Sequence, residues 1–171
     1  MKRVFTVLAL LIVVLLASVG AYLYSKQPTR QGQVELRNLQ GSVSVRYDER
    51  GVPHIRAENE TDLYRALGYV HAQDRLFQME AMRRLARGEL AEVLGPKLLD
   101  TDKLFRSLRI RERAARYVAS LDKQSPAWKA LQAYLDGINQ YQDSHAAPIE
   151  FDVLGIPKRP FTAEDSISVA G

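Results

Sequence analysis

The N-terminal part of the chain carries its longest apolar run, which extends from Val4 to Tyr24 with three short interruptions. Two basic residues, Lys2 and Arg3, precede this run. Positive charge before an apolar segment is typical of an export signal whose charged end stays in the cytoplasm. We therefore expect the rest of the protein in the periplasm or on the extracytoplasmic face of the inner membrane.

Residues 1–24 fit two kinds of export segment. A cleavable signal peptide has an apolar region of about 7 to 15 residues and a small-x-small cleavage site, for which Val19-Gly20-Ala21 is adequate. A membrane anchor needs about 20 apolar residues, which residues 4–24 supply, and Tyr22 and Tyr24 stand where interfacial aromatic side chains usually lie. We favour an uncleaved anchor that crosses the membrane at residues 4–24.

A polar linker is predicted at residues 25–33. This segment includes Pro28 and Gly32, which favour an extended or turning backbone. Folding is therefore expected to begin near Val34, and residues 34–171 are predicted to form the folded part of the chain.

A β-hairpin is predicted at the start of the folded part. Residues 42–47 alternate between polar and apolar, residues 48–51 suit a turn, and residues 52–57 can return as a second strand. Pro53 confines this second strand to a sheet edge or makes it irregular, because proline cannot donate a hydrogen bond to a neighbouring strand.

A long helix is predicted from Asn59 to Arg87. Asn59 and Asp62 form a capping pair that satisfies free backbone N–H groups in the first turn, and Gly88 is a natural stop. Gly68 is expected to bend the helix. Six apolar residues recur at helical spacing and are expected to face the core: Leu63, Leu67, Val70, Phe77, Ala81 and Leu85.

Two more helices are predicted after Gly88. Residues 90–94 suit a short helix that Gly95-Pro96 ends, because proline cannot continue it. The next helix, capped by Asp100 or Thr101, is expected to extend to about Leu121. Its inward residues are expected to be Leu104, Phe105, Leu108, Ala115 and Val118, with arginines 106, 109, 113 and 116 on another face.

The C-terminal third is expected to contain one long helix and the start of another. Ser125-Pro126 begins a helix that ends near Tyr141. Residues 147–160 are expected to be irregular and to pack on the surface through Phe151, Val153 and Leu154. A capping box at Thr162 to Asp165 opens a helix that has made barely two turns at Gly171, which favours a fragment. The predicted class is α+β, mainly helical, with a small β-hairpin followed by several α-helices.

Composition narrows the possible functions. A chain of 171 residues is long enough for one domain with a real core, and its net charge of +4 is modest. Much of the positive charge lies between Arg83 and Arg116, interleaved with leucine and glutamate, which predicts a solvated helical surface. No nucleic-acid motif accompanies it, so we expect no nucleic-acid partner. The chain has no cysteine, which excludes disulfides and cysteine nucleophiles within it.

Asp74 is the first candidate for chemistry, because it falls on the predicted apolar stripe one turn from Val70 and Phe77. A buried carboxylate has to be paired or hydrogen-bonded. It could act as a general acid or base, or bind a metal ion together with His71. We favour a structural pairing with an arginine or with backbone N–H groups, and Arg75 supplies a charge nearby.

The remaining polar candidates form no catalytic or metal motif. The three histidines lack the His-Glu-x-x-His spacing of a zinc site, and His54 is expected at a surface or interface, well away from His71 and His145. A serine nucleophile needs a base, and no Gly-x-Ser-x-Gly elbow is present. Ser166 and Ser168 are interpreted as ordinary helix residues.

Several blocks of the sequence resemble the start of the penicillin amidase family. The resemblance extends from about Val43 to Gly171 and includes the entry into a helix, Leu154-Gly-Ile-Pro-Lys-Arg-Pro-Phe161-Thr-Ala-Glu-Asp165. Its core is Gly51-Val-Pro-His-Ile, Gly68-Tyr-Val-His-Ala-Gln-Asp-Arg-Leu-Phe-Gln-Met-Glu, Arg83-Arg84, and Gly88-Glu-Leu-Ala-Glu-Val-Leu-Gly95.

The resemblance implies an exported acylase that is made as a precursor. The complete enzyme would be a layered α-β-β-α hydrolase whose two chains form by autocatalytic excision of a spacer. Its nucleophile would be the first residue of the larger chain, usually serine, whose free amino group serves as the base through water. Backbone N–H groups and an asparagine would hold the oxyanion. Members include penicillin, cephalosporin and acyl-homoserine-lactone acylases.

The resemblance assigns no catalytic or metal residue to the present chain. In the family, the small chain's acyl-pocket residues and one calcium ligand come from the helix that has just begun before Gly171, so calcium is possible in the complete enzyme only. Gly41-Ser42 mimics the cleavage junction of the family but lies upstream of the family block, so we expect no cleavage there.

We therefore expect an inactive N-terminal fragment of an acylase. Its partner would be the larger catalytic chain from the same precursor, and the substrate of the complete enzyme would be an N-acyl amide. The alternative is a membrane-anchored helical interaction module without catalytic activity.

Overall fold

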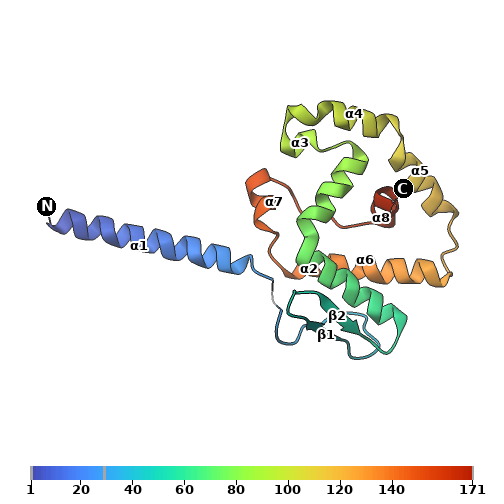
Figure 1. The fold of residues 1–171 in the computed structure, drawn as a ribbon, viewed down its shortest axis with the longest axis horizontal. Coiled ribbons are helices and arrows are strands. Elements are labelled where there is room, and N and C mark those ends of the chain that lie inside the picture. Colours follow the sequence, from blue (N-terminus) through green and yellow to red (C-terminus); the bar gives the residue numbers. More distant parts are fainter. Residues whose placement is uncertain (1, 29, 171) are drawn as a thin grey trace.

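The computed structural model describes residues 2–28 and 30–170 and confirms the α+β class, mainly helical with one small hairpin. Gly171 lies outside the described residues. The side chains of Lys2 and Arg3, the basic residues of the predicted export signal, also lie outside them. The elements in Figure 1 are α1 (Lys2–Ser25), β1 (Ser44–Tyr47), β2 (Pro53–Arg56), α2 (Glu60–Arg87), α3 (Ala91–Leu94), the 3-10 helix η1 (Pro96–Leu98), α4 (Leu99–Ser107), α5 (Ile110–Ser120), α6 (Pro126–Ser144), α7 (Ile149–Leu154) and α8 (Ala163–Ala170).

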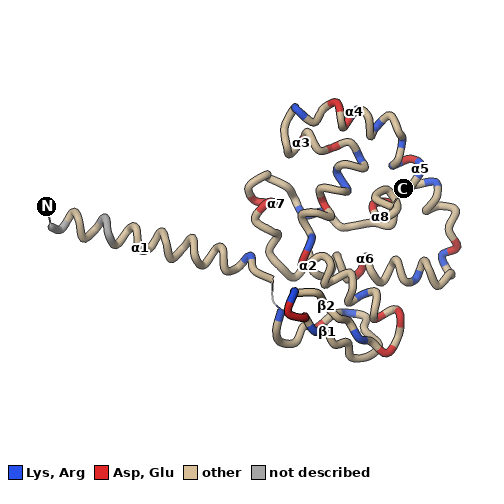
Figure 2. Tube along the Cα trace, in the orientation of Figure 1, with Lys and Arg blue, Asp and Glu red and all other residues tan. Residues whose placement is uncertain are grey.

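Helix α1 extends away from the folded body (Figure 1). Its segment Val4–Ser25 has a mean hydropathy of 2.8, and none of the side chains that the structure describes there is buried in the body. Its 22 residues measure about 33 Å at about 1.5 Å per residue, which matches the hydrocarbon core of a bilayer. Charged residues are instead spread over the body of the molecule (Figure 2). Length and composition fit a signal sequence as well as an anchor.

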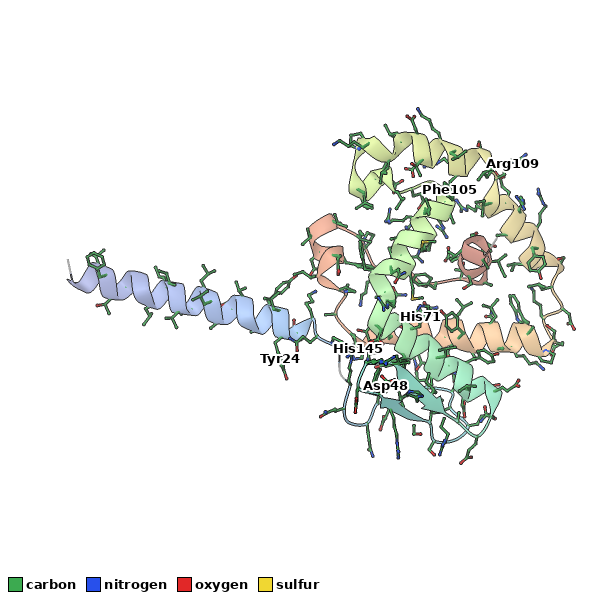
Figure 3. The ribbon with its side chains drawn as sticks, viewed as in Figure 1. Tyr24, Asp48, His71, Phe105, Arg109 and His145 are labelled. Atoms are coloured by element: carbon green, nitrogen blue, oxygen red, sulfur yellow. The ribbon has the colours of Figure 1, made fainter. Side chains whose placement is uncertain are left out.

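The hairpin forms as predicted, with two slightly shorter strands. Strands β1 and β2 pair antiparallel, with Val45 opposite Ile55 and Tyr47 opposite Pro53. The carboxylate of Asp48, labelled in Figure 3, accepts hydrogen bonds from the backbone N–H groups of Arg50 and Val52, both at 2.9 Å. This side chain therefore holds the turn that reverses the chain.

Helices α2 and α6 cross with their backbones in direct contact, and this crossing organises the core. A Cβ atom on Gly68 would collide with the carbonyl oxygen of Tyr134, and one on Gly137 would collide with that of Arg65. The buried cluster around the crossing consists of Tyr69, Ala72, Leu76, Leu135, Ile138, Tyr141, Phe151, Ile156, Phe161 and Ala163. The glycines are therefore required for the close approach of the two helices.

Helix α2 has the predicted ends but a different bend and a different buried face. Asn59 caps it by accepting the N–H of Asp62 at 2.8 Å, and Gly88 ends it in the left-handed conformation. The bend predicted at Gly68 is wrong, because the non-helical residue is Arg75, with φ −139° and ψ 18°. Leu67 is 39% exposed, since the glycine next to it, rather than a leucine stripe, faces α6.

The single helix predicted up to Leu121 is wrong, because α4 and α5 are separate. Arg109, labelled in Figure 3, adopts the left-handed conformation between them, with φ 52° and ψ 36°. Asp102 faces inward and accepts hydrogen bonds from the N–H groups of Leu90 and Ala91. This orientation leaves two predicted core residues largely exposed, Leu104 at 56% and Leu108 at 48%.

The C-terminal helices begin at the predicted caps, but the prediction for residues 147–160 is corrected. Ser125 caps α6 through the N–H of Trp128, and Thr162 and Asp165 form the predicted capping box of α8. Residues 147–160, expected to be irregular, contain the short helix α7. Phe151 is buried in it, whereas Val153, expected to pack, is 76% exposed, because the two side chains lie on different sides of the helix.

Candidate functional site: a groove beside a buried ion network

The three histidines lie in different places and have different partners. His54 lies on the exposed hairpin, 3.4 Å from a carboxylate oxygen of Asp48. His71 and His145, labelled in Figure 3, contact tyrosines of α6. Within residues 2–28 and 30–170, no group of three His, Cys, Asp or Glu side chains could hold a metal ion.

Asp74 is paired with an arginine, although not with its neighbour Arg75. Its carboxylate lies 3.5 Å from the guanidinium of Arg30 in the linker, and its side chain is 18% exposed. The carboxylate is therefore partly buried rather than fully buried as expected. His71 hydrogen-bonds to the hydroxyl of Tyr134 at 2.6 Å, so it contacts a different helix.

Two serines considered in the sequence, Ser42 and Ser168, and one that was not, Ser144, lie in local structural settings. The N–H of Gly41 donates to Asp62 at 2.9 Å, which fixes the Gly41-Ser42 segment just before β1. Ser168 is buried within α8. Ser144 lies 2.9 Å from His145, but its hydroxyl also bonds to the Gln140 carbonyl of the preceding helical turn. A hydroxyl has one proton to donate, so donation to that carbonyl leaves none for the histidine.

The first buried polar cluster joins the loop before β1 to α2 and α6. Asp62 is 1% exposed and accepts hydrogen bonds from the N–H groups of Gln40 and Gly41 and from Arg65. Arg65 in turn binds Asp136 of α6 at 2.8 Å. Burial alone would raise the pKa of Asp62, but the hydrogen bonds it accepts and the charge of Arg65 together hold that pKa below its usual value.

A second and larger cluster is centred on Glu80, which is fully buried. Its carboxylate accepts hydrogen bonds from Arg83 and Arg84, at 2.8 Å from the Nε atom of each. Arg159 reaches the same carboxylate at 3.3 Å from the segment that leads into α8. Three arginines therefore converge on one carboxylate, which satisfies a charge that would otherwise be very costly to bury.

Arg83 extends this network to the start of α8. Its guanidinium donates to the carbonyl of Pro160 at 3.0 Å, lies 4.1 Å from the ring centre of Phe161, and is 3.5 Å from Asp165. Asp165 is 2% exposed and also binds Arg87 at 2.6 Å. The network thus attaches the first turn of α8 to the C-terminal half of α2.

An open groove of about 580 Å³ lies between α2, α6 and α8 beside this network. Burial lowers the pKa of His71 in its wall, the charge of Arg75 lowers it further, and Asp74 opposes both. The exposed apolar side chains of the groove include Met82, at 41%, and Val169, at 44%. The groove is lined by His71, Arg75, Gln78, Met79, Met82, Tyr134, Phe161, Asp165, Ser166 and Val169.

Comparison with known proteins identifies the family. The model of the penicillin amidase family matches residues 42–171. The chain belongs to the penicillin amidase family. It is 42% identical over 143 residues to the penicillin acylase 2 proenzyme of Pseudomonas sp. (strain SE83), covering 83% of this chain and 18% of that protein. It is also 42% identical over 123 residues to the acyl-homoserine lactone acylase QuiP of Pseudomonas putida, covering 71% of this chain and 15% of that protein.

The fold agrees with this penicillin amidase assignment. A thermostable penicillin G acylase from Alcaligenes faecalis matches with a TM-score of 0.64 and 33% identity, covering 75% of this chain and 69% of that chain. This neighbour is an N-terminal nucleophile hydrolase. The present chain spans less than a fifth of the length of the two curated relatives.

Sequence reasoning missed the Glu80 network, although the penicillin amidase blocks contain most of its residues. Arg83 and Arg84 are 2% and 4% exposed, so the solvated surface predicted from Arg83 to Arg116 is wrong for its first members. It holds for arginines 106, 109, 113 and 116, which are exposed. The available signal was the spacing of Glu80 to Arg83 and Arg84, three and four residues on, which brings the side chains together on one helix face.

Proposed function

We propose that this chain is the N-terminal scaffold of an exported acylase that hydrolyses an N-acyl amide to a carboxylic acid and an amine. The single observation that carries the proposal is the family match over residues 42–171. The chain covers less than a fifth of the length of two relatives that are named as acylases. The nucleophile, its amino-group base and the oxyanion donors would belong to the larger catalytic chain of the same precursor.

The groove between α2, α6 and α8 is the proposed docking surface for that larger chain. Apolar side chains that are exposed together in a hollow favour association with another protein surface. Ser166 and Val169 of α8 line the groove, so polypeptide that follows α8 would start at its edge. The Glu80 network would hold α8 in place for this contact.

Localisation is part of the same proposal. Val4–Ser25 is long and apolar enough to cross a bilayer, and export fits a proenzyme relative. We propose that α1 is retained and holds the enzyme on the extracytoplasmic face of the inner membrane.

Activity assays on two forms of the protein test the acylase proposal. We expect the product of the complete gene to hydrolyse a chromogenic N-acyl nitroanilide or an N-acyl homoserine lactone, and residues 26–171 alone to be inactive. Hydrolysis by residues 26–171 alone, or a gene that ends at Gly171, would overturn the proposal.

A variant pair tests the docking surface. Met82→Asp places a charge in the groove, and Leu104→Asp places one on an exposed leucine of α4 outside it. We expect Met82→Asp to reduce co-purification of the two chains and Leu104→Asp to leave it unchanged. Equal recovery from both variants would contradict the docking assignment.

A further inference from the structure

The C-terminal end of α1 is bonded to α7, although more than 120 residues separate them in the sequence. The ammonium group of Lys26 lies 2.5 Å from the carboxylate of Asp152 and donates to the carbonyl of Ala147 at 2.9 Å. The hydroxyl of Tyr22 donates to the same carboxylate at 2.5 Å. These bonds hold the pKa of Asp152 below its usual value, with Lys26 as the main cause, so the carboxylate is charged at neutral pH.

The bond to Tyr22 fixes the depth of α7 relative to a membrane. Tyr22 lies in the last turn of Val4–Ser25, where a spanning helix leaves the hydrocarbon core and enters the headgroup layer. A carboxylate bonded to the Tyr22 hydroxyl lies at nearly the same depth. Figure 1 shows α7 on the side of the body that faces the end of α1. Helix α7 is therefore at headgroup level when α1 crosses the bilayer.

The side of α7 that contacts α1 is also its exposed apolar side. At 3.6 residues per turn, Ile149, Asp152 and Val153 lie within an arc of about 100°, with Phe151 on the opposite side. Phe151 is 2% exposed and packs in the core, whereas Ile149 and Val153 are 37% and 76% exposed. The two exposed side chains therefore flank the carboxylate that binds Lys26 and Tyr22.

We propose that α7 is a membrane-contacting element whose Ile149 and Val153 side chains enter the boundary between phospholipid headgroups and acyl chains. The bonds from Lys26 and Tyr22 to Asp152 set the orientation of the folded body relative to α1. This contact keeps one side of the enzyme against the bilayer and leaves the opposite side, with α5, facing away (Figure 1). The inference rests on the proposed retention of α1 as an anchor.

Depth-dependent fluorescence quenching tests this contact in the full-length protein. The enzyme is reconstituted into phosphatidylcholine vesicles, with an environment-sensitive fluorophore attached at Val153→Cys or, as a control, at Tyr117→Cys of α5. Tyr117 is 54% exposed, and the chain described here has no cysteine of its own; any cysteine elsewhere in the enzyme is replaced by serine. We expect lipids spin-labelled near the headgroup to quench the probe at 153 at least threefold more than the probe at 117.

Flotation of the same vesicles separates the possible failures. Protein that floats with the vesicles while both probes are quenched equally would overturn the α7 contact and leave the anchor intact. Mature protein that does not float would overturn the anchor, and the α7 contact with it. Hydrolysis of the N-acyl nitroanilide is measured independently, so neither result bears on the acylase assignment.

A second variant tests the role of the Asp152 bonds. Asp152→Ala is expected to lower quenching at position 153 while flotation is unchanged. Asp143→Ala is the matched control, because this exposed carboxylate pairs with Arg37 instead of α1. Quenching at position 153 that is the same in both variants would show that Asp152 does not orient the body.

Discussion

Replacing Glu80 by glutamine should destabilise the protein far more than the same change at Glu92. Both carboxylates bind Arg84, at 2.8 Å and 3.2 Å. They differ in burial, because the Glu80 side chain is fully buried and the Glu92 side chain is 60% exposed. The pair therefore compares a carboxylate buried among three arginines with an exposed carboxylate that binds one of them.

The magnitude follows from the charges left behind. Glu80 and Asp165 oppose Arg83 and Arg84, and all four side chains are less than 5% exposed. Glu80→Gln leaves two buried guanidinium groups opposite one buried carboxylate. Removing one partner of a buried ion pair costs about 3–5 kcal/mol, whereas an exposed pair contributes about 0–1 kcal/mol. In a unit of about 150–250 residues, these costs correspond to Tm decreases of about 6–20 °C for Glu80→Gln and less than about 4 °C for Glu92→Gln.

Scanning fluorimetry of residues 26–171 measures this difference, and limited proteolysis reports whether α8 has become accessible. We expect cleavage near residues 159–165 to increase in Glu80→Gln only. Equal melting temperatures for the two variants would refute the conclusion that this network holds α8 on α2.

Three other substitutions test separate parts of the fold. In urea titrations, Gly68→Ala should lower the free energy of unfolding by about 1–3 kcal/mol or more, because its Cβ atom would overlap the Tyr134 carbonyl. Gly20→Ala is the control and should not lower it, because nothing lies within 4 Å of a Cβ atom at that position. Arg109→Gly should leave the Tm unchanged or raise it, since glycine relieves a left-handed conformation that costs other residues about 1–2 kcal/mol. A decrease of about 1 kcal/mol in the free energy of unfolding would instead indicate a continuous helix. Asp62 has a lowered pKa in the fold, so its contribution to stability is present above its unfolded pKa of about 3.9 and is lost as the pH falls below that value. The difference in free energy of unfolding between wild type and Asp62→Asn should therefore become smaller as the pH falls below about 3.9.

Local signals in the sequence predicted several helix ends, although the cap expected at Asp100 or Thr101 is wrong, because α4 begins at Leu99 without a side-chain cap. Asn59, Ser125 and Thr162 cap helices through their own side chains, and Gly88 adopts the conformation expected at a helix end. Each of these signals involves residues within four positions of one another. Short-range chemistry of this kind can be recognised without knowing the tertiary fold.

Tertiary contacts explain where the sequence-based predictions were wrong. Periodicity assigned Leu104 to the core, but the inward bonds of Asp102 rotate α4 so that this leucine faces outward. The break at Arg109 has no glycine or proline to announce it. Gly68 was predicted to bend α2, but it instead allows α6 to approach closely. That approach also requires Gly137, which lies 69 residues further along the chain.

The ion network also constrains the order in which the chain can fold. Helix α2 places Glu80 and Arg83 on a buried face, but their remaining partners are Arg159, Asp165 and the carbonyl of Pro160. In a nascent chain that does not yet include residues 159–165, Glu80 and Arg83 lack these partners. The N-terminal region can therefore reach its final packing only after the start of α8 has emerged, which makes its maturation dependent on synthesis of nearly 80 further residues.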